Sequence, residues 1–183
     1  MSEIVRETRE TRVTVQLSMR PGTESAKCTT TDVVLDHMLV TLARYSGLNL
    51  AVTAVGDLRH HLIEDVAIAL GLALRDAVPV TCRRYGAALV PMDDALVEAA
   101  VDVGGRFYYR GGLPSTLYEH FFRSLAENAG LTLHLRVLRG RDRHHIVEAA
   151  FKAAGFALSQ ALAEGDTVFS TKGGVHIKRS KGA

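Results

Sequence analysis

Three features that mark whole classes of protein are scarce in this 183-residue sequence. Its two cysteines, Cys28 and Cys82, are isolated and form no Cys-x-x-Cys pair, so neither a zinc knuckle nor a disulfide framework is indicated. Its apolar runs, such as residues 66–74, are far shorter than the roughly 20 residues that a membrane-spanning helix needs. Its formal net charge of +2 is close to neutral and gives no argument for nucleic-acid binding.

Both ends of the chain are instead rich in charge. Residues 1–12 read MSEIVRETRETR, which does not resemble the start of a signal peptide. Residues 175–183 are locally basic, and we expect them to form a flexible, solvated tail. Hydrophobic and charged fractions of 47% and 23% are ordinary for a globular protein with a real core. We therefore expect a cytoplasmic protein with reduced cysteines.

The sequence does contain an internal repeat. The hexapeptide RHHLIE at residues 59–64 returns as RHHIVE at residues 143–148. Upstream, His37 pairs with His120 at an offset of 83, and after one inserted residue the offset becomes 84. Several glycines and leucines fall into the same register, which indicates a duplicated unit.

The first helix of each half can be located from its spacing and its ends. Apolar side chains recur at helical spacing over residues 33–42, with Thr31 or Asp32 available as the N-cap. Glycines at equivalent positions, Gly47 and Gly130, are expected to end the first helix of each half. A second helix is expected to start near each double histidine.

Strands are predicted on both sides of each first helix. Residues 48–54 and 131–138 alternate between apolar and polar side chains, as half-buried strands do. Each half therefore reads as two strands, a helix, a strand and a helix, and the two halves can stack helix layer on helix layer. The predicted fold class is α+β, with duplicated ββαβα halves at residues 1–88 and 89–174 and the helices packed between two sheets.

The double histidines suggest metal binding. Glu64 lies on the same side of a helix as His60 and His61, but the two histidines diverge by about 100°, so one ion can hardly take both. Two ions, one for each histidine, are a natural solution. The second half repeats the arrangement, and the full set of candidate ligands is His37, His60, His61, Glu64, His120, His144, His145 and Glu148.

This ligand set divides into two sites of three imidazoles and one carboxylate each. Mixed nitrogen and oxygen ligands suit Mn, Fe, Zn or similar ions, and four protein ligands leave positions open on a six-coordinate metal. A single helical histidine is far more often a packing or surface residue. Here six of the eight histidines share one duplicated pattern, and only His134 and His176 stand outside it. We therefore predict a metal-binding protein.

Nine segments occur in a specific order between about residue 6 and residue 174: ETRETR, LDHML, HHLIED, RRYG, PMDDAL, VDVGGR, EHFF, HHIVEAAFKA and STKGG. In this order they resemble the imidazoleglycerol-phosphate dehydratase family of histidine biosynthesis. The resemblance implies a fold like domain 2 of ribosomal protein S5. It also implies self-association into trimers and a probable 24-subunit shell, with two Mn²⁺ per protomer, or other divalent metals, bound between subunits.

The resemblance further implies roles for individual residues. All eight candidate metal ligands match the family, and Glu10, His61 and His145 take catalytic roles. Substrate and phosphate contacts carry over to Glu10, Arg84, Arg106, Lys152, Ser170, Thr171 and Lys172. Charge-assisted hydrogen bonds from such groups suit a phosphate, although each residue taken alone reads as an ordinary surface group.

The implied reaction is loss of water from D-erythro-imidazole-glycerol phosphate, which gives imidazole-acetol phosphate. The proton to be removed sits on a carbon that no carbonyl acidifies. Metal coordination to the imidazole would favour an imidazolate that expels the neighbouring hydroxyl. Glu10 is the candidate for proton transfer, although in sequence it is one charge in a run of alternating Arg and Glu.

The chain departs from the family pattern around the substrate. The loop at residues 57–59 is short, with Arg59 where the family places aspartates. The other replaced positions are Thr41, Tyr45, Asp94, Gly104 and Asp142. Two alternatives follow: a divergent paralogue that acts on another imidazole-bearing or phosphorylated substrate, and a non-catalytic metal-binding shell protein. A carboxylate-bridged four-helix oxidase is disfavoured, because such bundles need long uninterrupted helices where strands are predicted.

Overall fold

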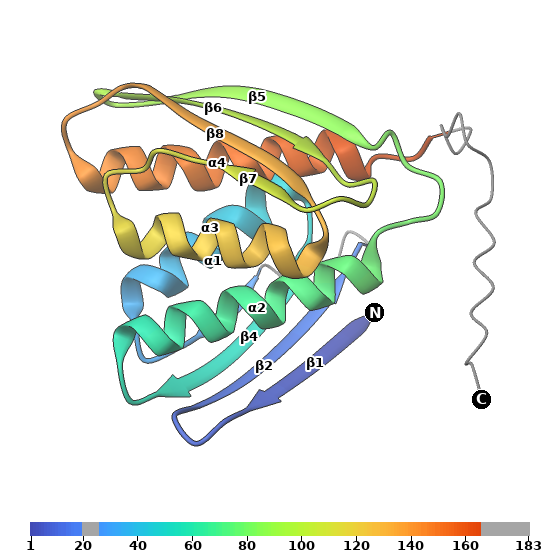
Figure 1. Ribbon diagram of the computed structural model, residues 1–183, viewed down its shortest axis with the longest axis vertical. Helices are drawn as coiled ribbons and strands as arrows, with labels where there is room; N and C mark the ends of the chain where they lie inside the picture. The colour runs from blue at the N-terminus through green and yellow to red at the C-terminus, as the bar shows by residue number, and fades with distance from the viewer. Residues whose placement is uncertain (20–25, 166–183) are drawn as a thin grey trace, which may run out of the picture.

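The computed structural model describes residues 1–19 and 26–165, in which two four-stranded sheets enclose a layer of four helices (Figure 1). The first sheet has the order β1-β2-β4-β3, from β1 (Ser2–Glu7), β2 (Thr11–Ser18), β3 (Lys27–Thr29) and β4 (Asn49–Gly56). The second has the order β5-β6-β8-β7, from β5 (Tyr85–Met92), β6 (Ala95–Asp102), β7 (Tyr108–Arg110) and β8 (Thr132–Arg139). The helices are α1 (Val33–Ser46), α2 (Arg59–Ala77), α3 (Thr116–Ala129) and α4 (Arg143–Leu162). The predicted α+β fold class is confirmed.

Each half contains one strand more than the predicted order of two strands, a helix, a strand and a helix. β3 and β7 occupy one edge of their sheets and pair in parallel with β4 and β8, whereas the other strand pairs are antiparallel. β5 crosses the boundary at residues 88 and 89 that we expected between the halves. The division of the halves at residues 88 and 89 stays a proposal. The expected tail at residues 175–183 lies outside the described residues.

The ends of the two first helices follow the sequence expectations. Asp32 is the N-cap of α1, and its carboxylate accepts the backbone N–H groups of Val34 and Leu35, each at 2.9 Å. Gly47 ends α1 with φ 73°, and Gly130 ends α3 with φ 66°. This left-handed conformation is one that glycine adopts without the steric cost of a Cβ.

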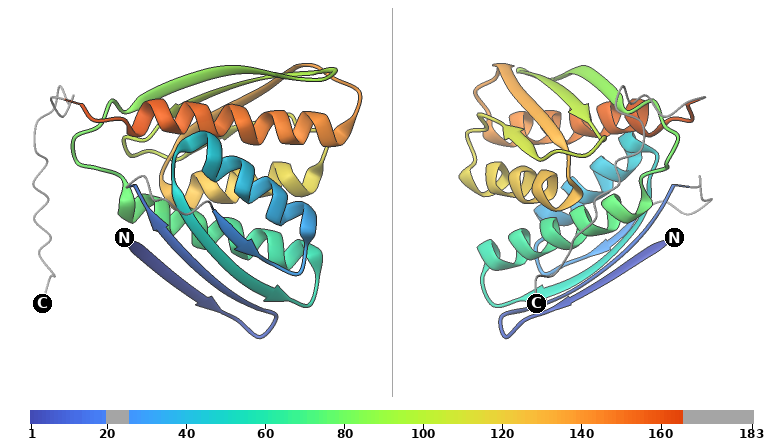
Figure 2. Two further views of the ribbon diagram at one scale, coloured as in Figure 1. Left: turned by 180° about the vertical axis from the view of Figure 1, so that it is seen from behind. Right: turned by 45° about the vertical axis from the view of Figure 1, so that its right-hand side comes forward.

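The helices of one half pack on the helices of the other. α1 packs against α4, and α2 packs against α3, as both views of Figure 2 show. A Cβ on Gly155 of α4 would lie 2.8 Å from Cβ of Tyr45, and a Cβ on Gly71 of α2 would lie 2.7 Å from the carbonyl oxygen of Leu125. These two glycines are equivalent in the repeat, and each permits a close helix crossing. The crossings bring the histidine-bearing turns of different halves together.

The core lies in the helix layer and along the inner faces of both sheets. Phe121, Phe122 and Phe151 are fully buried, and the ring of Phe151 lies 5.0 and 4.6 Å from the other two ring centres. Burial of such rings supplies a large apolar area to the fold. Within residues 1–19 and 26–165, no helix has the length and apolar character needed to cross a membrane.

The helix crossings predict the effect of adding a methyl group. Gly71→Ala and Gly155→Ala should each destabilise the protein by about 1–3 kcal/mol, because the new Cβ overlaps the facing helix. The melting temperature should fall by roughly 2–10 °C in thermal denaturation. Gly112→Ala is the control, since a Cβ there meets no atom within 4 Å. An equal loss of stability in Gly112→Ala would contradict the role of the two helix crossings.

Candidate metal centre and functional site

The first candidate metal cluster joins α1 to α4. His37 Nε2 lies 3.0 Å from Glu148 Oε2, and His144 Nε2 lies 3.3 Å from the same oxygen. The two imidazoles are stacked, with ring centres 5.9 Å apart. His144 and Glu148 share one face of α4 because they are four residues apart, while His37 comes from the other half of the chain.

The second cluster is the counterpart of the first and joins α3 to α2. His120 Nε2 lies 3.1 Å from Glu64 Oε1, and His60 Nε2 lies 3.5 Å from Glu64 Oε2. The rings of His60 and His120 have centres 5.1 Å apart. Each cluster thus contains two imidazoles and one carboxylate, and each draws its ligands from both halves.

The donor atoms of both clusters fit a divalent metal. In each cluster the three potential ligand atoms lie within 4.8 Å of one another. Nε2 of His120 is buried and makes no hydrogen bond of acceptable geometry among the described residues, despite its 3.1 Å approach to Glu64. A buried imidazole nitrogen without a hydrogen-bond partner is suited to a metal ion. Three ligands of mixed nitrogen and oxygen type leave coordination positions open.

Glu148 is the more buried of the two carboxylates, with 7% of the residue exposed. Burial favours the neutral acid, but hydrogen bonds from His37 and Lys152 outweigh it and lower the pKa of Glu148. Lys152 Nζ lies 2.9 Å from Glu148 Oε1. The predicted substrate contact Lys152 therefore lies beside the first metal cluster, and the carboxylate is held ionised, as metal ligation requires.

His61 and His145 face away from these clusters. His61 Nδ1 lies 3.0 Å from Asp57 Oδ1 and 3.3 Å from Glu10 Oε2. His145 Nδ1 lies 2.8 Å from Asp94 Oδ1. The predicted divergence of adjacent histidines is therefore present, but within residues 1–19 and 26–165 no third imidazole joins either cluster.

Carboxylates on equivalent hairpin turns meet these two histidines. Glu10 lies in the turn between β1 and β2, and Asp94 lies in the turn between β5 and β6. The hydrogen bond with Asp57 is the main cause that raises the pKa of His61, and the bond with Asp94 does the same for His145. In return, His145 is the main cause that lowers the pKa of Asp94 to about 2. Both half-buried imidazoles are thus paired with anions.

A buried network fixes the turn that carries Glu10. Asp65 accepts hydrogen bonds from Arg6 Nε at 3.0 Å and from the hydroxyl of Thr11, and it is 8% exposed. Arg6 and Thr11 lie on the two strands that flank the turn, so Asp65 ties both strands to α2. Sequence reasoning missed this network. The sequence contains one sign of the network: HHLIED and HHIVEA differ at their last residue, so that Ala149 occupies the position equivalent to Asp65.

Two further predicted phosphate contacts, Arg84 and Arg106, lie at the opposite end of α4. Arg84, with φ 73°, donates two hydrogen bonds to Asp102 at 2.7 and 3.0 Å. Burial favours the neutral acid, but the hydrogen bonds from Arg84 and the charge of Arg106 lower the pKa of Asp102. The backbone N–H of Arg84 donates to the carbonyl of Ala161 at 2.8 Å. His144 lies in the first turn of the same helix, about 26 Å from Ala161 along the helix axis. Within one chain, Arg84 and the first cluster are therefore not brought together; Ser170, Thr171 and Lys172 lie outside the described residues.

Several of the replaced positions have local structural partners. Arg59 donates to Asp32, the N-cap of α1, through a short contact. The ring of Tyr45 packs edge-on against Phe156, with centres 4.8 Å apart. Gly104 lies where a Cβ would overlap Arg84 Nε at 2.1 Å. A side chain at position 104 would displace the Arg84 guanidinium from Asp102.

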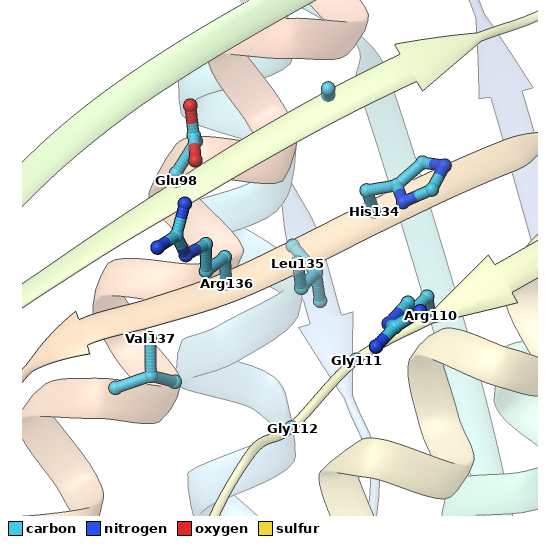
Figure 3. Close-up of a pocket in the computed structure, with 9 residues that line it drawn as sticks. Glu98, Arg110, Gly111, Gly112, His134, Leu135, Arg136 and Val137 are labelled. Carbon is cyan, nitrogen blue, oxygen red and sulfur yellow. The ribbon is translucent and has the colours of Figure 1, made fainter.

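A further cavity of about 490 Å³ opens on the outer face of the second sheet (Figure 3). Arg110, His134 and Arg136 line it together with Glu98. These side chains point away from the helix layer that holds the histidine clusters. None of the predicted site residues lines this cavity, so we do not place the chemistry there.

Comparison with known proteins agrees with this geometry. The sequence profile described as "Imidazoleglycerol-phosphate dehydratase" matches residues 29–158. The chain belongs to the imidazoleglycerol-phosphate dehydratase family. The protein of that name from Pyrococcus furiosus is 42% identical over 92% of this chain and 98% of its own length. The one from Methanoculleus marisnigri is 45% identical over 88% and 91%, respectively.

Solved structures of the family share the fold. The crystal structure of the enzyme from Pyrococcus furiosus in complex with (S)-C348 has a TM-score of 0.85 and 40% identity, and covers 94% of this chain and 100% of that one. The structure from Staphylococcus aureus has a TM-score of 0.76 and 32% identity, and covers 90% and 99%. The chain is thus an enzyme of the hydro-lyase class, which confirms the resemblance read from its motifs.

The clusters predict a metal content that can be measured. After loading with Mn²⁺ and removal of free ions, the protein should retain about two divalent ions per chain. His37→Ala and His120→Ala should each lose about one ion, because each removes an imidazole from a different cluster. Elemental analysis by inductively coupled plasma mass spectrometry provides the measurement.

His134→Ala is the matched control, because His134 lies on β8 beside Tyr108 and outside both clusters. It should retain the full metal content. Retention of all ions by both cluster variants would show that the ions bind elsewhere.

The Asp65 network predicts a local effect on the first hairpin. Asp65→Ala leaves Arg6 and Thr11 without their acceptor and should cost roughly 1–3 kcal/mol of stability. Amide hydrogen exchange at residues 8–11 should accelerate. Arg12→Ala is the control, since its 3.2 Å pair with Glu7 is exposed and should contribute little. Unchanged exchange in Asp65→Ala would refute the role of this network.

Proposed function

We propose that the chain dehydrates D-erythro-imidazole-glycerol phosphate to imidazole-acetol phosphate, as a cytoplasmic enzyme of L-histidine biosynthesis. The observation that carries the proposal is the pair of clusters in which each glutamate meets one histidine from each half of the chain. Membership of the dehydratase family supports the choice of imidazole-glycerol phosphate as the substrate. The clusters supply the chemical means, since an imidazole substrate is itself a metal ligand.

The first ion would be held by His37, His144 and Glu148, and the second by His60, Glu64 and His120. We take both to be Mn²⁺, with other divalent metals as substitutes. A bound cation would favour the ionised form of the substrate imidazole and orient a substrate hydroxyl. The protein's part is to fix three ligands per ion and to leave positions open for the substrate.

The proposed site is completed by neighbouring subunits. Each cluster has two imidazoles, and His61 and His145 point outward from the same chain toward exposed carboxylates. We propose that these two histidines serve as the third imidazole of clusters in adjacent protomers. Trimers and a 24-subunit assembly would provide such neighbours, and would bring Arg84, Arg106, Ser170, Thr171 and Lys172 of one subunit to the clusters of another.

Glu10 is the proposed proton-transfer group. Its carboxylate lies 3.3 Å from His61 Nδ1 and is 57% exposed, so it stands at the surface where a substrate and a second subunit could meet it. The Asp65 network holds the flanking strands and therefore restricts where Glu10 can reach. A carboxylate positioned in this way can take or return a proton beside a polarised substrate.

Turnover of the proposed substrate is the direct test. Wild-type protein with Mn²⁺ should convert imidazole-glycerol phosphate to imidazole-acetol phosphate, as followed by NMR spectroscopy. Glu10→Gln and His61→Ala should lower kcat by about 10²–10⁴ through loss of proton transfer and of a cluster ligand. His134→Ala should retain activity.

Metal content and assembly state must be measured on the same samples. If the wild type is fully metallated and assembled yet shows no turnover, the assigned reaction is wrong. The proposed metal sites would be unaffected by this result. The chain would then be assigned as a divergent paralogue that acts on another imidazole-bearing or phosphorylated substrate.

A further inference from the structure

The cavity of about 490 Å³ on the outer face of the second sheet is not used by the proposed reaction (Figure 3). Its lining residues come from β6, β7 and β8 and from the segment that follows β7. β7 pairs with β8 only as far as Arg110, so β8 has no neighbour on that side beyond this point. The small residues Ala100, Gly111 and Gly112 line the cavity as well. They leave open space between longer, charged side chains.

The register of the sheet gathers three charged side chains around this space. β6 and β8 place Glu98 opposite Arg136 and Ala100 opposite His134, while β7 and β8 place Arg110 opposite His134. Cross-strand partners project from the same face of a sheet, and so do residues two apart on one strand. Arg110, Arg136 and Glu98 therefore share the outer face around the small Ala100. Two of these three charges are positive.

Both guanidiniums of the cavity are available to a ligand. Neither Arg110 nor Arg136 has an ion pair or a hydrogen bond in the described part of the chain, although Glu98 lies opposite Arg136. The ring of His134 packs against Tyr108 instead, with centres 5.3 Å apart. A single exposed arginine is simply solvated, but two that share one cavity repel each other. An anion with several acceptor oxygens relieves this repulsion and can accept from both guanidiniums.

The rim of the cavity beside β7 is held in place from below. Glu119 Oε2 accepts the hydroxyl of Tyr109 at 2.9 Å and the backbone N–H groups of Gly112 and Leu113 at 3.1 and 3.0 Å. A Cβ on Gly111 would overlap this carboxylate and this hydroxyl, so glycine allows the chain to follow this path. One side chain of α3 thus fixes the segment after β7. A preformed rim lowers the cost of ordering the site when a ligand binds.

We propose that this cavity binds the phosphate group of a small molecule through the Arg110 and Arg136 guanidiniums. The two charges of a phosphate monoester balance two guanidiniums, and its three terminal oxygens can accept from both at once. A carboxylate carries one charge and fits one guanidinium fork, and Glu98 offsets part of the positive charge that would attract it. The cavity faces away from the helix layer that holds the histidine clusters, so its ligand is a second molecule.

Inorganic phosphate is the probe, titrated calorimetrically as the dianion into the metal-free full chain and into the Mn²⁺-loaded protein freed of excess ions. Arg110→Gln and Arg136→Gln should each weaken binding by roughly tenfold, because each removes charge-assisted hydrogen bonds. Glu98→Gln should tighten binding, since it removes the negative charge that faces the ligand. Arg139→Gln is the matched control and should leave the affinity unchanged, because Arg139 lies on the same strand and does not line the cavity.

Acetate should bind more weakly than phosphate, and equal or tighter binding of acetate would refute the assignment to phosphate. Unchanged phosphate affinity in both arginine variants would overturn the proposal, because the phosphate would then bind elsewhere, for example at the histidine clusters. An equal loss in Arg139→Gln would do the same, since it would indicate a general effect of net charge. Binding to the metal-free chain that disappears in the Mn²⁺-loaded protein would also count against the site. None of these measurements uses turnover, so failure of the dehydration assay and failure of this proposal are distinguishable.

Discussion

The close crossing of α4 over α1 and of α2 over α3 is the constraint on which the site depends. Both crossings join one half of the chain to the other, and Gly155 and Gly71 allow the helices to approach. Metal–ligand distances tolerate shifts of only about 0.2 Å. A helix pushed outward by one methyl group would therefore separate His37 from Glu148, or His120 from Glu64, by more than an ion can bridge. The same close packing of the helices therefore fills the core and sets the distances within the clusters.

Much of this arrangement could be predicted from the repeat, because hydrophobic periodicity and helix-capping residues depend only on nearby positions in the sequence. The Asp32 cap, the Gly47 and Gly130 ends and the helices that start at the double histidines follow from neighbouring residues alone. The predicted order had one strand too few in each half, because a strand of only three residues, such as β3, carries no recognisable period. The sequence also did not show which helix packs against which. Two equivalent halves permit pairing within a half as readily as between halves, and only packing decides between them.

Duplication has left a symmetric scaffold with unequal hairpins. In the first half, Asp65 secures the turn that carries Glu10 from beneath, through Arg6 and Thr11. In the second half, where Ala149 replaces that carboxylate, Asp94 stabilises its own turn by accepting backbone N–H groups from Arg141 and Asp142. Asp94 Oδ2 accepts these backbone groups while its Oδ1 meets His145 at 2.8 Å, whereas the Glu10 carboxylate meets His61 and accepts no backbone N–H group among the described residues. Glu10 is therefore the freer of the two carboxylates to exchange a proton with a substrate.

Arg84 lies far from the first histidine cluster. Its backbone is bonded to Ala161, about 26 Å along α4 from His144. A substrate that carries an imidazole and a phosphate a few bonds apart cannot span that distance. Either Arg84 has a structural role with Asp102, or it serves a cluster in another protomer. The histidines favour a role for Arg84 in another protomer. His61 and His145 also point away from the clusters of their own chain, and each of those clusters has two imidazoles. The proposed neighbouring subunit would answer both observations, because it would supply a third imidazole to each cluster and bring Arg84 to it.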